Sequence, residues 1–254
     1  MALHLTAPIP TGATITSVDS VAPFGSSELF DAIEAGDIAE VNRLFSPMDL
    51  EAVNDLGETP LTVAARVGNA DIVTFFLEKG ADIHATCLAD ATIYEVAISE
   101  EQPEIALMII NHEENAERKQ QMLNRALTSA VYGNKPAAAR LLLASGADYD
   151  ILVSPIGLER VGPEPLIDDS IPLLNYAARL LSIDILRELI DAGARYTLDG
   201  TTVLKTDRMG KTILYYVQNP DTTLVCTRLL TVEYEPVQDD VLTFLQERFP
   251  FATP

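Results

Sequence analysis

Apolar residues recur at helical spacing in pairs of short segments along most of the chain. In the clearest pair, a narrow apolar face is followed by a broader one. The residues of the two faces are Leu61, Ala64 and Ala65, and then Ile72, Val73, Phe76 and Leu77. Because spacings of three and four residues align side chains along one side of an α-helix, the pattern predicts two amphipathic helices.

Capping and turn residues mark the ends of these two helices. Thr59 is suited to cap the first helix, and Pro60 then occupies the first helical position, where its missing N–H costs nothing. Gly68 permits a tight turn between the helices, and Gly80 ends the second one. Residues 54–85 therefore form one helix-turn-helix unit.

This unit resembles the ankyrin repeat, whose pattern is a glycine turn, TPLHxAA, a glycine and histidine, an apolar helix and GADVNA. The sequence departs from that pattern at three places, where Thr62, Asn69 and His84 replace the usual His, His and Asn. The resemblance implies an all-α solenoid. Its helix-turn-helix units would each be about 33 residues long and joined by hairpin loops.

The same frame recurs on both sides of this unit. Thr92 falls 33 positions after Thr59, which is the ankyrin period. The other units cover residues 27–45, 92–110, 123–148, 172–194 and 209–230, a charged linker covers 111–119, and a final helix at 237–249 caps the stack. We therefore expect a single domain over residues 26–250 with about five to six units.

The first 25 residues differ in composition from the rest. They contain no Lys or Arg and are rich in Thr, Ser and Pro, so they lack the charged start of a secretory signal peptide. We interpret residues 1–25 as a disordered or extended leader. A delivery signal of another kind, or an arm that packs on the first unit, would also fit this composition.

Two insertions interrupt the period. Residues 150–170 contain Pro and Gly without a helical pattern, and residues 196–206 place Asp199-Gly200 between β-prone residues, which is a hairpin signal. Both fall between units, where ankyrin proteins carry projecting fingers that often belong to the binding face. The alternative is that they only lengthen loops, at little cost to the stack.

The resemblance also implies where a partner would bind. In ankyrin proteins the exposed concave surface carries the turn residues before the TPL element and the two residues before the inter-helix glycine. The equivalent positions here are Asp55, Leu56, Glu58, Arg66, Val67, Ser99, Glu100, Val131, Tyr132, Arg179 and Leu180. We predict an apolar row of Val67, Tyr132 and Leu180 on this surface. The alternative is that Val131 and Leu180 fill gaps between units.

The charge balance narrows the choice of partner. The 17 Lys and Arg residues stand against 38 Asp and Glu residues, a net charge of −21. A field of this sign repels phosphate, so we expect neither nucleic acid nor anionic membrane as a partner. It favours another protein with a basic surface, bound by a monomer of this chain, although acidity can also serve solubility alone.

Candidate chemistry is scarce. The three histidines, His4, His84 and His112, show no metal-ligand spacing, and Cys87 and Cys226 lie far from each other and belong to no CxxC motif. We therefore predict no catalytic, cofactor or metal site, and a protein that is not an enzyme. Two unpaired thiols fit a reducing, cytoplasmic setting, with delivery into another cell left open.

Two functions fit these observations. The first is a protein-interaction module that acts as a scaffold, an adaptor or an effector in another cell. The second is a dedicated acidic inhibitor, such as an immunity protein that blocks a basic toxin or nuclease by fast, electrostatically steered association. The inhibitor predicts binding that weakens strongly as salt is added. A scaffold with an apolar concave site predicts binding that survives high salt.

Overall fold

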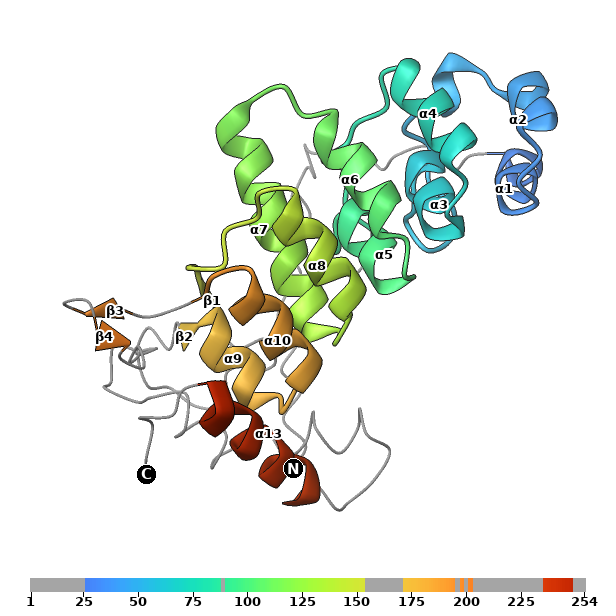
Figure 1. Ribbon diagram of the computed structural model, residues 1–254. Helices are drawn as coiled ribbons and strands as arrows, with labels where there is room; N and C mark the ends of the chain where they lie inside the picture. The colour runs from blue at the N-terminus through green and yellow to red at the C-terminus, as the bar shows by residue number, and fades with distance from the viewer. Residues whose placement is uncertain are drawn as a thin grey trace, which may run out of the picture.

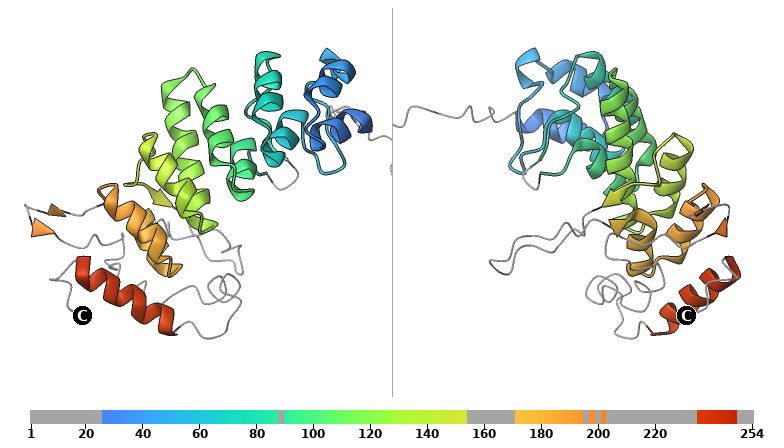
Figure 2. Two further views of the ribbon diagram at one scale, coloured as in Figure 1. Left: turned by 45° about the vertical axis from the view of Figure 1, so that its right-hand side comes forward. Right: turned by 90° about the vertical axis from the view of Figure 1, so that its left-hand side faces the viewer.

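The computed structural model describes residues 26–87, 90–153, 171–194, 197–198, 201–202 and 235–248. The leader at 1–25, the unit at 209–230, His4 and Cys226 lie outside these ranges. Figures 1 and 2 show the described helices as successive antiparallel pairs that follow one another in a curved, elongated stack. The predicted all-α solenoid is confirmed.

In the part of the chain that the structure describes, five helix pairs form the stack in two rows. The first helices of the pairs are α1 (Ser27–Glu34), α3 (Pro60–Val67), α5 (Ile93–Ser99), α7 (Ala116–Tyr132) and α9 (Leu173–Arg179). Their partners are α2 (Ile38–Leu44), α4 (Ala70–Glu78), α6 (Pro103–Asn111), α8 (Pro136–Ala144) and α10 (Ile183–Asp191), and a 3₁₀ turn, η1 (Pro47–Asp49), follows α2. Helices of one row contact the equivalent helices of the next unit, so each unit is stabilised by its neighbours as well as by its own helix pair. We call them the first-helix row and the second-helix row.

The helix starts follow the predicted capping chemistry. The Thr59 side chain accepts a hydrogen bond from the N–H of Thr62, and Pro60 opens α3. One period later, Thr92 forms a capping box with Glu95, whose carboxylate accepts the Thr92 N–H at 2.9 Å. These side chains satisfy N–H groups that have no partner inside the helix.

The turn between the two helices of each unit has one residue in the left-handed conformation. These residues are Gly36, Gly68, Glu101, Asn134 and Leu181, with φ between 51° and 81°. The first four recur every 32 or 33 positions, and the fifth follows after 47, since the first insertion precedes it. The left-handed residue therefore fixes the register of the weaker units.

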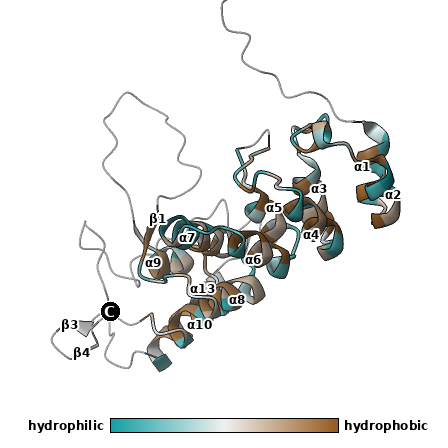
Figure 3. Cartoon of the chain, turned by 90° about the horizontal axis from the view of Figure 1, so that it is seen from above, coloured by the Kyte–Doolittle hydropathy of each residue, from teal (hydrophilic) through white to brown (hydrophobic). Residues whose placement is uncertain are grey.

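The core lies between the two rows and between successive units. Its largest fully buried side chains include Phe76, Ile72, Leu127 and Tyr176, and small residues such as Ala64 let the first helices approach closely. Figure 3 shows hydrophobic and hydrophilic residues interspersed along the helices, and the residues of the two apolar faces predicted for 54–85 are buried. The apolar faces predicted from the sequence are therefore the buried ones.

The charged linker predicted at residues 111–119 is only partly a linker. Helix α7 begins at Ala116, two turns before the apolar pattern, with the Asn115 side chain accepting the N–H of Arg118 at 2.9 Å. The prediction of a linker was wrong from position 116 onward because charged residues such as Glu117 favour helix without supplying an apolar face.

Short strands and one further helix complete the described chain. Strands β1 (Leu152–Val153) and β2 (Ile171–Pro172) pair antiparallel across the first insertion. Strands β3 (Thr197–Leu198) and β4 (Thr201–Thr202) also pair, as the hairpin signal between them predicts. Helix α13 (Glu235–Arg248), expected at 237–249, lies against α10.

Candidate interaction surface

The turns and the first-helix row hold the residues predicted to bind a partner. Leu56 is 60% exposed at the turn before α3, and Asp55 beside it is exposed. Ser99 and Glu100 are exposed at the end of α5, one unit further along. Val67, Tyr132 and Arg179 are half-buried at the ends of α3, α7 and α9. These side chains are available on one row of the stack.

Three of the predicted residues are buried and cannot meet a partner directly. Glu58 is buried, and its carboxylate accepts hydrogen bonds from Asn54 and Arg66. Val131 is fully buried and Leu180 is 2% exposed, so both fill space between units, which was the alternative considered from the sequence. The apolar row of Val67, Tyr132 and Leu180 therefore loses its last member.

The error at Val131 is one of register. The sequence places the inter-helix turn at Gly133, but Gly133 has ordinary helical geometry and Asn134 is the left-handed residue. The positions equivalent to Arg66 and Val67 are therefore Tyr132 and Gly133.

Arginines on the first-helix row join neighbouring units. Arg66 of α3 contacts Glu34 of α1 at 2.9 Å and Glu58 at 3.0 Å. Two units further along the stack, Arg125 of α7 contacts Glu95 of α5 at 2.8 Å. The hydrogen bond that Arg66 donates to Glu34 raises the pKa of Arg66, and the one that Arg125 donates to Glu95 raises the pKa of Arg125. Both cations are thus partly neutralised by carboxylates of their own protein.

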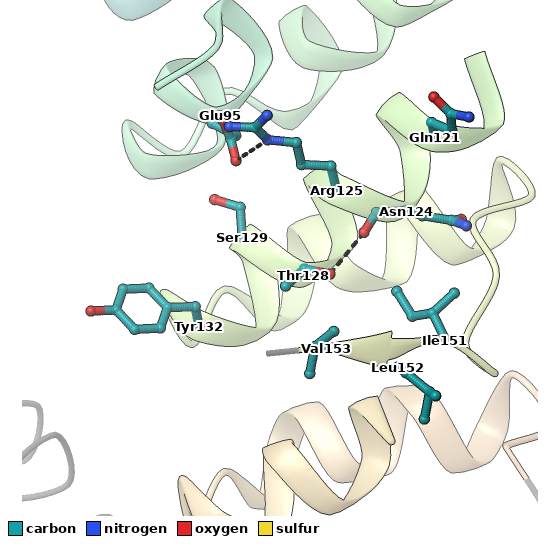
Figure 4. A pocket seen from close by; sticks show the side chains of 10 residues that line it. All are labelled: Glu95, Gln121, Asn124, Arg125, Thr128, Ser129, Tyr132, Ile151, Leu152 and Val153. Atoms are coloured by element: carbon teal, nitrogen blue, oxygen red, sulfur yellow. Dashed lines mark hydrogen bonds and ion pairs between the residues drawn. The ribbon is translucent and has the colours of Figure 1, made fainter. Parts of the chain in front are cut away.

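A groove that the sequence did not reveal runs between α7 and β1. It has a volume of about 540 Å³ and is lined by Glu95, Gln121, Asn124, Arg125, Thr128, Ser129, Tyr132, Ile151, Leu152 and Val153. Figure 4 shows hydroxyl and amide groups of α7 on one side of the groove and residues 151–153 on the other, with Ile151 pointing toward α7 and Leu152 pointing away from it. The groove exists only because residues 151–153 approach α7 in the folded chain, so no local sequence signal marks it.

The described residues offer little for metal or redox chemistry. No group of three or more His, Cys, Asp and Glu side chains that could hold a metal ion is found among them. His84 instead contacts the Glu113 carboxylate at 3.0 Å, between two units. No helix in the described ranges is long and apolar enough to cross a membrane.

Comparisons with known proteins agree on one family. The family described as Ankyrin repeats (3 copies) matches residues 11–87 and 29–121. A curated relative, the ankyrin repeat and KH domain-containing protein CBG24701 of Caenorhabditis briggsae, is 30% identical over 182 residues. The match covers 70% of this chain but spans only 6% of that relative.

A solved structure shares the fold. It is a chain of the complex between the predatory endopeptidase Bd0816 of Bdellovibrio bacteriovorus and the immunity protein Bd3460. The likeness has a TM-score of 0.50 at 20% sequence identity, and covers 85% of this chain and 98% of that one.

Proposed function

Because this chain is an ankyrin-repeat protein, and ankyrin repeats are protein-interaction modules, we propose that it binds a partner protein with a basic surface. The binding surface is the first-helix row with the turns that precede it. Ankyrin-repeat proteins are generally not enzymes, and this proposal assigns no catalysis to the chain.

The observation that carries the proposal is the distribution of charge on that surface. The exposed carboxylates of the N-terminal first helices and turns include Glu28, Asp31, Glu34, Asp55 and Glu100. On the same row Arg66 and Arg125 are held by Glu34, Glu58 and Glu95. The surface is therefore negative, and its complement is a cationic protein.

Exposed apolar and aromatic residues supply a centre for such an interface. Leu56 stands exposed among the carboxylates, and Val67 and Tyr132 lie half-buried at the ends of their helices. Large side chains that are partly exposed and rigidly held are the usual anchors of protein interfaces. Carboxylates around them would steer a basic partner and exclude an acidic one.

The proposal is tested by affinity capture from the cells of origin with matched charge variants. The double change Asp55→Lys and Glu100→Lys removes two exposed carboxylates from the proposed surface. The double change Glu78→Lys and Glu104→Lys makes the same net charge change on exposed positions of the second-helix row. We expect the first variant to lose the captured protein and the second to keep it. Equal loss in both variants would show that net charge, and not this surface, holds the partner.

A second candidate function is the dedicated inhibitor, and the solved complex with an immunity protein favours it as a use of this fold. An inhibitor of this kind blocks its partner at equimolar concentration. Mixing the purified partner with increasing amounts of this chain, with the partner's own activity as the readout, separates the two functions. Full inhibition at one equivalent supports the inhibitor, and unchanged activity of the bound partner supports the scaffold.

A further inference from the structure

The groove between α7 and β1 meets one edge of the strand β1. Neighbouring side chains on a strand point to opposite faces, so a groove on one face would meet alternate residues only. This groove is lined by three consecutive residues, Ile151, Leu152 and Val153. It therefore follows an edge of the strand. Because β2 occupies the opposite edge, the groove lies along the edge that carries no strand in the described structure.

The main chain of Leu152 points into that free edge. The N–H of Leu173 donates to the carbonyl oxygen of Ile151 at 3.0 Å, which makes these two a hydrogen-bonded pair. Hydrogen-bonded and non-hydrogen-bonded pairs alternate along an antiparallel ladder. Leu152 and Pro172 are the next pair, so Leu152 directs its N–H and carbonyl away from β2. Pro172 has no backbone N–H, so it cannot donate a hydrogen bond to Leu152.

The surroundings of the groove define what could bind there. Leu152 is 47% exposed, and Tyr132 and Ile151 are partly buried against the core, so an apolar side chain would find apolar contacts. The exposed Asp90 lies near Arg125, whose guanidinium donates to the Asp90 carbonyl oxygen. The exposed Asp148 lies at the other side, where its N–H donates to the Asn124 side chain. The two carboxylates flank a groove with an apolar side at residues 151–153 and a polar side along α7, where Arg125 is paired with Glu95.

We propose that this groove takes an extended segment of the basic partner protein, which adds as a strand beside β1. One residue of the segment pairs with the N–H and carbonyl of Leu152. An apolar side chain of the segment packs on the exposed Leu152, and flanking Lys or Arg residues lie beside Asp90 and Asp148. The inference rests on the proposed function, since it names the part of the partner that one region of the same surface recognises.

The test uses the full chain and a synthetic probe. The probe is a fluorescein-labelled heptapeptide of alternating lysine and apolar residues with a central phenylalanine, KVKFKVK. We expect saturable binding by fluorescence anisotropy, and none for the glutamate analogue EVEFEVE. Methylation of the one peptide amide nitrogen that donates to the Leu152 carbonyl should weaken binding about fivefold, since one hydrogen bond contributes about 1 kcal/mol, and methylation of the adjacent amide nitrogens should not. Absence of saturable binding by KVKFKVK would overturn the inference.

Two variants of one residue separate main-chain pairing from side-chain contact. Leu152→Ala shortens the side chain but keeps the N–H, and Leu152→Pro also removes the N–H that faces away from β2. We expect Leu152→Pro to bind the probe several-fold more weakly than Leu152→Ala, with circular dichroism and thermal midpoint showing both folded. Equal affinities of the two variants would contradict strand addition.

Two further measurements show whether another molecule fills the groove, and whether strand addition beside β1 can fail while binding on the first-helix row stands. If the wild-type chain dimerises in sedimentation analysis and Leu152→Pro does not, a second copy fills the groove and the partner assignment is wrong. If Leu152→Pro binds the purified partner as tightly as wild type, whereas the Asp55→Lys, Glu100→Lys variant does not, this inference fails and the proposed function stands. If neither variant changes the affinity, both fail.

Discussion

At the residue scale, the left-handed turn positions show where the chain departs from its own repeat pattern. Gly36 and Gly68 occupy this conformation without cost, but Glu101 and Leu181 hold it with a Cβ atom present. A left-handed residue other than glycine costs roughly 1–2 kcal/mol. At Leu181, which is 5% exposed, burial of the side chain offsets this conformational cost. Glu101 is exposed and gains only a surface ion pair with Lys135.

Glu101→Gly is therefore expected to stabilise the protein by about 0.5 kcal/mol. Relief of the left-handed strain exceeds the added entropy of an unfolded glycine and the small contribution of an exposed ion pair. The matched control is Glu100→Gly, because Glu100 is also exposed but has φ of −86°. It should lose about 0.5–1 kcal/mol. Urea denaturation of both variants measures the difference, and a control more stable than Glu101→Gly would refute the reasoning.

Glu113 links the loop after α4 to the start of α7. Its carboxylate accepts the N–H of Asn115 at 2.8 Å and contacts His84 and Arg118, and its side chain is 4% exposed. The Asn115 hydrogen bond is the largest cause that lowers the pKa of Glu113, followed by Arg118 and His84. The folded state thus favours the ionised carboxyl more than the unfolded chain does.

The stability that Glu113 contributes should therefore depend on pH in one direction. It is fully present above the unfolded pKa of a glutamate, about 4.3, and is lost as the pH falls through the lower folded pKa. We expect Glu113→Gln to lower the urea midpoint at pH 7, and the difference from wild type to shrink in acid. Glu114→Gln, at an exposed neighbouring position, should change neither. A constant deficit at every pH would contradict the ionic role.

At the element scale, α3 depends on both of its neighbours. Ala64 is fully buried on α3, which packs between α1 and α5. Ala64→Leu would force these helices apart and should cost about 1–3 kcal/mol. Hydrogen exchange should show α1 and α5 losing protection together. Ala70→Leu adds the same side chain at an exposed position and should be nearly neutral. Loss of protection in α3 alone would argue against nearest-neighbour coupling.

Much at this scale follows from local sequence. The helices of the clearest unit, their threonine caps and the left-handed glycine are predictable because each rests on a few neighbouring residues. The early start of α7 and the place of Asn134 are not, since a polar helical extension and a one-residue shift leave the apolar pattern nearly unchanged. The burial of Val131 and Leu180 and the groove beside β1 depend on how distant segments approach, which no local pattern encodes.

At the scale of the whole molecule, the fold places several basic side chains in ion pairs between units. Several of the described cations form ion pairs between units, as Arg66 does with Glu34, Arg125 with Glu95, and Arg140 with Glu188. Because 38 acidic residues stand against 17 basic ones, such pairs cannot neutralise a chain of net charge −21. A long surface of one sign accelerates encounter with a partner of opposite sign and weakens as salt screens it.

The rate of association with the captured partner, measured by stopped flow from low to high salt, tests the central claim most directly. The account predicts a fast association that slows steeply with ionic strength. It also predicts that the Asp55→Lys, Glu100→Lys variant associates more slowly than its Glu78→Lys, Glu104→Lys control at low salt, and that the two converge at high salt. An association rate that does not depend on ionic strength, or that is the same for both variants at low salt, would contradict binding of a basic partner on the first-helix row.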